Sequence, residues 1–121
     1  MAADPGCDMN EAISILFMLL GAHAICDFPL QGDFMAKAKN PVSPLPGVPW
    51  WIVMAAHSLI HGVAVASVTG RPDLGALEVF THFCIDTGKC RGGYGFTTDQ
   101  CLHVVCKGVW WMVWIGLHQG A

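Results

Sequence analysis

Apolar residues dominate four stretches of the chain, at about 10–30, 49–69, 73–89 and 99–118. The first, second and fourth are close to the ~20 residues that an α-helix needs to cross a bilayer. The third is shorter and contains several polar residues, so we expect a short or tilted helix there. This pattern predicts an all-α fold, a four-helix integral membrane bundle, with residues 1–121 forming a single membrane domain.

The connecting segments contain residues that interrupt helices. Residues 40–49 (NPVSPLPGVP) are proline-rich and cannot continue a helix. The second stretch ends at TGRPD (69–73), and a glycine-rich turn is expected at 88–98 (GKCRGGYGFTT). Thr98 is positioned to cap the last helix.

The composition favours a chain dissolved in lipid. Charged residues make up 12% and hydrophobic residues 54% of the chain, whereas a soluble domain usually carries about 25% charge. The net charge of −3 and the lack of a basic stripe argue against a nucleic-acid partner. Membrane lipid is therefore the expected surrounding, and a neighbouring protomer could cover the third helix in a homo-oligomer.

The cysteines and the N-terminal segment also bear on the class of protein. The six cysteines form no CxxC pair and lie mostly in apolar runs, so we expect small buried side chains rather than disulfides or zinc ligands. The sequence AHA at 22–24 mimics a signal-peptide cleavage site. The residues before the first helix are acidic, however, whereas export signals begin with positive charge. We therefore expect the first segment to be retained as a helix.

The distribution of basic residues predicts an orientation. Lys37 and Lys39 fall in the first connecting segment, Lys89 and Arg91 in the third, and Arg71 alone in the second. Because positive charge favours the cytoplasmic side, we expect the first and third segments in the cytoplasm and both termini outside. The predicted location is a multi-pass protein of the bacterial inner membrane.

Polar residues recur four apart in every apolar stretch, so each helix has one polar face. The helices alternate in direction, and the order of histidine and aspartate is reversed in the last helix. All three aspartates should therefore lie at one level near the cytoplasmic side, with the histidines one turn deeper, about 6 Å at 1.5 Å per residue. The pairs are His23 and Asp27, His57 and His61, His82 and Asp86, and Asp99 and His103.

Glu78 and Lys107 extend the same faces by one further turn. A lone charge at that depth costs several kcal/mol, which predicts a buried ion pair between these residues. The alternative is that Lys107 extends its amino group to the membrane surface.

A layer of imidazoles and carboxylates predicts a site for a divalent metal, zinc, manganese or iron, with one or two ions. Among the candidates, His61 and His82 could instead support a ligand or carry protons. A hydrogen-bonded polar core without metal is the alternative, and His118 is expected to be unrelated. The candidate ligands are His23, Asp27, His57, His61, His82, Asp86, Asp99 and His103.

Four short motifs resemble a bacterial and phage membrane-protein family catalogued as domain of unknown function 3307. They are HAICDFPLQ (23–31) followed by Lys-x-Lys, AHSLIH (56–61), HFCIDTGK (82–89) and TDQCLH (98–103). The resemblance implies a small multi-spanning membrane protein and adds Gln31, Gln100 and Lys89 to the functional set, but it implies no activity. A weaker similarity links the chain to inner-membrane proteins predicted to be metal-dependent hydrolases, which carry H-x3-H helices.

The resulting functional hypothesis is metal-dependent hydrolysis of a lipid-associated or phosphorylated substrate. Asp27 or Asp99 would bridge ions or act as general base, and Lys89 and Lys107 would neutralise developing negative charge. Gln31, Gln100 and Glu78 would support the ligands.

Three alternatives remain at this point. The site could carry a metal ion across the membrane, or histidines could hold a haem. The chain could also be a non-catalytic protein that binds a metal or a partner, for example a phage-encoded component that acts on host machinery.

Overall fold

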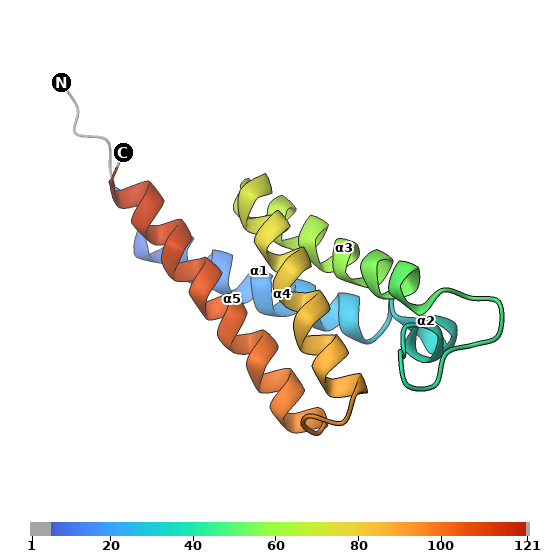
Figure 1. The fold of residues 1–121 in the computed structure, drawn as a ribbon. Coiled ribbons are helices and arrows are strands. Elements are labelled where there is room, and N and C mark those ends of the chain that lie inside the picture. The colour runs from blue at the N-terminus through green and yellow to red at the C-terminus, as the bar shows by residue number, and fades with distance from the viewer. Residues whose placement is uncertain (1–5, 121) are drawn as a thin grey trace.

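The computed structural model describes residues 6–120, and within this range it is all-helical, with no strand (Figure 1). The all-α prediction is therefore confirmed, although one short helix was not predicted. The helices are α1 (Met9–Asp27), α2 (Gly32–Ala38), α3 (Trp50–Thr69), α4 (Pro72–Cys90) and α5 (Phe96–Gln119).

The first helix was predicted to continue to residue 30, which is wrong. α1 ends at Asp27, and a turn leads into α2, which lies in the segment predicted to connect the first two helices. Pro29 explains the early end, because proline lacks the amide donor that would continue the helical hydrogen bonds. Gly32 then adopts a positive φ of 61°, which redirects the chain into α2.

The boundaries of α3 and α4 agree with the prediction to within one residue at each end. Gly70 ends α3 in the left-handed conformation, and Pro72 occupies the first turn of α4, where its missing amide donor costs nothing. α4 is not short: it has 19 residues, as many as α1.

α5 begins at Phe96, three residues before the predicted start, and Gly95 rather than Thr98 is its N-cap. The turn between α4 and α5 is correspondingly shorter than predicted, covering residues 91–95. Tyr94 holds this turn against α4, since its hydroxyl donates to the carbonyl of Ile85. Partial burial of the phenol raises the pKa of Tyr94.

The four long helices contact one another in a closed cycle, α1 to α3, α3 to α4, α4 to α5 and α5 to α1. α2 packs beside α3. The segment with α2 and the turn 91–95 lie together at one end, which we call the loop end, opposite the start of α1 and the end of α5 (Figure 1).

The contact between α3 and α4 is unusually close at two glycines. A Cβ atom added to Gly75 would lie 2.6 Å from the carbonyl oxygen of Gly62, and one added to Gly62 would lie 2.7 Å from that of Gly75. Only glycine at both positions allows the two backbones to approach this far. The contact holds α3 and α4 together next to the histidines that they carry.

Most large apolar side chains point outward. Phe17, Phe80 and Met112 are 78%, 70% and 68% exposed, respectively, whereas much of the interior is polar. α1, α3 and α5 are each long and apolar enough to cross a membrane, and the charges of α4 set it apart from them. An apolar outer surface on apolar helices of this length indicates a membrane protein.

Five buried apolar residues form a cluster away from the loop end. Leu19, Val65, Leu74, Trp110 and Trp114 pack against one another there. Trp114 also donates its indole N–H to the carbonyl of Thr69, so its polar atom is satisfied. This apolar cluster fills the half of the interior that lies farther from α2.

Candidate metal centre

A dense group of buried polar side chains occupies the other half of the interior. Every long helix contributes residues to it at one-turn spacing, as the sequence pattern predicted. Each is at most 9% exposed. The group consists of His23, Asp27, Lys39, His57, Ser58, His61, Glu78, His82, Asp86, Asp99, His103 and Lys107.

The deepest part of this group is the predicted ion pair. Lys107 Nζ lies 2.6 Å from Glu78 Oε1, and both side chains are 1% exposed. Trp110 donates its indole N–H to the other carboxylate oxygen of Glu78, at 2.7 Å. The prediction of a buried pair is therefore confirmed, and the alternative that Lys107 reaches the membrane surface is wrong.

Four residues on the loop-end side of this ion pair could together hold a metal ion. Asp27, His57, His61 and His82 each offer one ligand atom, and these atoms all lie within 4.8 Å of one another. Asp27 Oδ1 is 3.2 Å from His61 Nε2 and 3.4 Å from His57 Nε2. We call these residues the four-residue set. They combine one carboxylate with three imidazoles from α1, α3 and α4.

Several ring nitrogens in this set are buried without a hydrogen-bond partner among the described residues. They include both nitrogens of His57, both of His61 and Nε2 of His82. Each buried polar atom left unpaired costs about 1–3 kcal/mol. Ligation of a cation would satisfy one nitrogen of each of the three rings.

A second set lies beside the first, closer to the loop end. Asp86, Asp99 and His103 also offer ligand atoms within 4.8 Å of one another. His103 Nε2 is 3.1 Å from Asp86 Oδ1 and 3.4 Å from Asp99 Oδ1. We call these residues the outer set. A third possible grouping, of Glu78, His82 and His103, shares members with the other two.

His23 lies within the cluster but in none of these three groups. Its Nε2 hydrogen-bonds to Gln100 Oε1 at 3.1 Å. Gln100 in turn donates from Nε2 to Asp27 Oδ2 at 2.7 Å and to Asp99 Oδ2 at 3.2 Å. Gln100 thus connects the four-residue set with the outer set. Gln31, in contrast, donates to the backbone carbonyl of Asp27.

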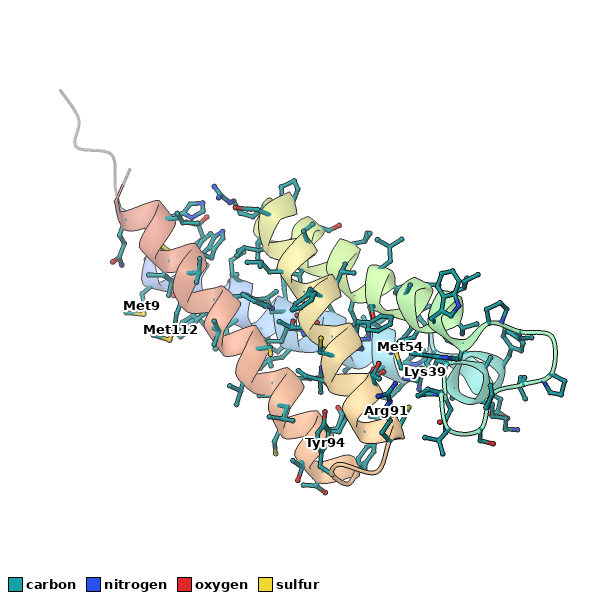
Figure 2. The ribbon with its side chains drawn as sticks, in the orientation of Figure 1. Met9, Lys39, Met54, Arg91, Tyr94 and Met112 are labelled. Carbon is teal, nitrogen blue, oxygen red and sulfur yellow. The ribbon has the colours of Figure 1, made fainter. Side chains whose placement is uncertain are left out.

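Lys39 is a buried member of the cluster that sequence reasoning used only to predict orientation. It directly follows α2, and its ammonium group pairs with Asp86 on α4. Figure 2 shows its side chain extending from the α2 side toward α4. The signal that could have identified it is the Lys-x-Lys that follows HAICDFPLQ. Lys89, which was predicted to be functional, lies 3.4 Å from Asp99 Oδ2 and is 35% exposed.

A cavity of about 80 Å³ lies beside the carboxylates of the three aspartates, at the loop end. All three aspartates line it, which agrees with the predicted order of aspartates toward the loops and histidines deeper. The lining residues are Asp27, Phe28, Gln31, Lys39, Asp86, Lys89, Phe96, Asp99 and Gln100.

The remaining candidates lie outside the cluster. His118, expected to be unrelated, stacks on Trp114 with ring centroids 4.1 Å apart. All six cysteines are free, as predicted, but only Cys26 is buried, and Cys84 and Cys101 are exposed on the apolar surface. The expectation of buried cysteines therefore holds for Cys26 alone.

The fold and the cluster together define an all-helical membrane protein with buried histidine and aspartate groups that could hold a metal ion. The family model described as protein of unknown function (DUF3307) matches residues 15–119, and the chain belongs to this family. The resemblance predicted from the four motifs is thereby confirmed.

Comparison with curated proteins and with solved structures returns no match. The weaker similarity to predicted metal-dependent hydrolases therefore receives no support from these comparisons.

Proposed function

We propose that this protein binds a divalent cation in its membrane-embedded core and uses it to hydrolyse a lipid-associated or phosphorylated substrate. The four-residue set would be the principal metal site, and the outer set a second site that opens on the cavity. Zinc, manganese and iron suit mixed imidazole and carboxylate ligands.

The observation that carries the proposal is the four-residue set itself. Its four ligand atoms converge within 4.8 Å, and five of its buried ring nitrogens have no hydrogen-bond partner among residues 6–120. A polar core held only by hydrogen bonds would satisfy these nitrogens with neighbouring donors and acceptors. The Nε2 atoms of His57 and His61 both lie near the Asp27 carboxylate, and this arrangement favours a shared cation.

A bound dication would supply Lewis acidity and a lowered pKa for water. The chain provides the remaining functions of a hydrolase. Asp99 Oδ1 is buried without a hydrogen-bond partner in the described part of the chain, and Asp99 lines the cavity. Asp99 is therefore one candidate to accept a proton, and Asp27, which lines the same cavity, is the other. Lys89 is placed to neutralise negative charge near Asp99.

Two observations count against the alternatives of transport and haem binding. A transport path would continue from the cluster to the opposite end, but the apolar cluster of Leu19, Val65, Leu74, Trp110 and Trp114 occupies that half. A porphyrin needs far more room than a cavity of about 80 Å³.

The proposal includes a membrane arrangement. α1, α3 and α5 would cross the bacterial inner membrane, with α4 completing a four-helix bundle among them. The loop end would face the cytoplasm and both termini the outside, as the basic residues predict. Membrane lipid would contact the exposed apolar faces, and a homo-oligomer would cover part of α4.

Elemental analysis of the detergent-purified protein tests the metal. We expect about one or two equivalents of zinc, manganese or iron per chain, and loss of metal in His61→Gln. His118→Gln is the matched control, because His118 stacks on Trp114 outside the cluster, and it should retain the wild-type metal content. Equal metal content in wild type and His61→Gln, or none in either, would refute the metal site.

Turnover distinguishes the enzyme from a non-catalytic metal-binding or partner-binding protein. Metal-loaded protein should hydrolyse at least one member of a panel of phosphoesters, esters and amides, and Asp99→Asn should abolish that activity. A protein that retains its metal but hydrolyses none of them would be the non-catalytic alternative.

A further inference from the structure

We propose that the cavity at the loop end binds the phosphate group of the substrate, and that Lys39 and Lys89 hold it once the metal is bound. This inference rests on the proposed function, because it requires a cation on the carboxylates. It selects phosphomonoesters from the broader class of lipid-associated or phosphorylated substrates.

The position of Lys39 is the first support. Lysine is rarely buried, yet Lys39 is only 7% exposed and lines the cavity. Its chain segment extends back from the turn after α1 so that its ammonium group reaches Asp86. A lysine that served only to orient the chain in the membrane would not need to be buried. Lys37 on the same segment is exposed and could serve that role.

The charge balance of the cluster is the second support. The cluster contains four carboxylates, those of Glu78 and the three aspartates, and three ammonium groups, those of Lys39, Lys89 and Lys107. Its net charge is therefore one negative charge when the histidines are neutral. One dication converts this to one net positive charge, and a second dication on the outer set would raise it to three. A buried site with net positive charge is stabilised by an anion.

The partners of the two lysines are the third support. Lys39 pairs with Asp86 and Lys89 with Asp99, and both aspartates belong to the outer set. A cation on the outer set would pair with these aspartates in place of the lysines. Both ammonium groups would then be available to donate hydrogen bonds to an anion in the cavity between them.

The size and rim of the cavity indicate the kind of anion. About 80 Å³ is several times the roughly 10–15 Å³ that one water needs, but far below the ~300 Å³ of a pocket for a drug-sized ligand. It has room for one phosphate group. Phe28 and Phe96 line the cavity, are more than half exposed and have ring centroids 6.4 Å apart, so an apolar tail could lie against them.

Calorimetric titration with inorganic phosphate tests the inference. The protein would be loaded with manganese or zinc, desalted in detergent and assayed for metal before each titration. We expect Lys39→Gln and Lys89→Gln each to weaken phosphate binding about tenfold or more, since each removes a charged hydrogen-bond donor. Lys37→Gln is the matched control and should bind phosphate as wild type does. Metal-free wild type should bind it at least about tenfold more weakly than the loaded protein.

A second series identifies the source of the phosphate group. Phosphatidic acid and phosphatidylcholine in mixed micelles would each compete with inorganic phosphate. Competition by phosphatidic acid alone would indicate a lipid phosphomonoester. Competition by a soluble phosphomonoester but by neither lipid would indicate a soluble one, and both outcomes support the inference.

The outcomes separate this inference from the proposed function. If wild type carries no metal, the proposed function fails and this inference fails with it. If wild type carries metal but phosphate binds equally to wild type, Lys39→Gln and Lys89→Gln, the inference alone fails. Because Lys89 is only half-buried, Lys89→Gln decides the question if Lys39→Gln does not fold.

Discussion

The two halves of the interior are built from the same helices but by opposite means. Toward the loop end, the helices bury histidines, carboxylates and lysines in one polar group. In the other half they bury Leu19, Val65, Leu74, Trp110 and Trp114. Two tryptophans there satisfy their indole N–H groups, Trp110 on Glu78 and Trp114 on the carbonyl of Thr69.

This difference indicates how the chain divides stability from function. In lipid, apolar side chains gain little by turning inward, so helix association depends on close packing and interhelical hydrogen bonds. The apolar half provides that packing. The polar half leaves ring nitrogens unpaired among residues 6–120, which would cost stability unless a ligand satisfies them. We therefore expect mutations in the two halves to have separable effects.

The largest effect on stability should come from breaking the deep ion pair. Lys107→Met leaves the Glu78 carboxylate buried without its cation, and should lower the free energy of unfolding by about 3–5 kcal/mol. Unfolding by denaturing detergent, followed by circular dichroism, measures this. Lys107→Met combined with Glu78→Gln should recover most of the loss, and no recovery would show that the charge imbalance is not the cause.

A similar loss of stability, with the metal retained, is expected in the apolar half. Trp114→Ala leaves a cavity and removes the bond to Thr69, and should cost about 3–5 kcal/mol. Met112→Ala on the exposed face is the control and should change stability little. Elemental analysis of the same samples should show unchanged metal in both variants. Loss of metal in folded Trp114→Ala would mean that the halves are not separable.

The contact between α3 and α4 should be the next most sensitive feature. The added methyl group of Gly75→Ala would meet the backbone of Gly62 at 2.6 Å, which forces the helices apart and should cost about 1–3 kcal/mol. Gly116→Ala is the control, because nothing lies within 4 Å of a Cβ atom there. That substitution should be neutral or slightly stabilising. Detergent unfolding of both variants tests this, and equal midpoints would contradict the close contact.

The smallest expected effect concerns metal affinity alone. Gln100→Ala removes hydrogen bonds to His23, Asp27 and Asp99 without removing a candidate ligand. Losses of this kind typically weaken metal binding by about 10–100-fold. Competition with a chelator of known affinity measures the change. Unchanged affinity would mean that Gln100 does not orient the carboxylates when the metal is bound.

Helical periodicity explains why so much of the cluster could be predicted. Residues four apart must share a helix face, so the pairs of histidine and aspartate had to form stripes. Alternating helix direction then placed the aspartates at one level. The ion pair between Glu78 and Lys107 followed from the same reasoning, because both continue the stripes by one turn.

The rotation of each helix about its axis could not be predicted from spacing. His23 was a first choice as ligand and His61 a second, yet His61 belongs to the four-residue set and His23 contacts Gln100 instead. Which residue of a stripe points at a neighbour depends on packing across helices, and spacing along one helix does not contain that information.

Lys39 was not predicted to be buried because its position depends on a turn rather than on a helix. The prediction continued the first helix through Pro29, which would have placed Lys39 in an exposed loop. The positive φ of Gly32 instead turns α2 back beside α3. The start of α5 also depends on a turn and was also missed: Gly95, the last residue of the turn, is the N-cap, whereas Thr98 was predicted.

The ion pair of Lys39 with Asp86 has a consequence for how the chain can vary in length. The length of the segment 28–39 is fixed by this ion pair, because one inserted residue would move the Lys39 ammonium group away from the Asp86 carboxylate. The segment 41–48 beyond it only has to reach the start of α3. We therefore expect natural relatives and engineered variants to gain or lose residues after Asn40 and to keep the spacing before it unchanged.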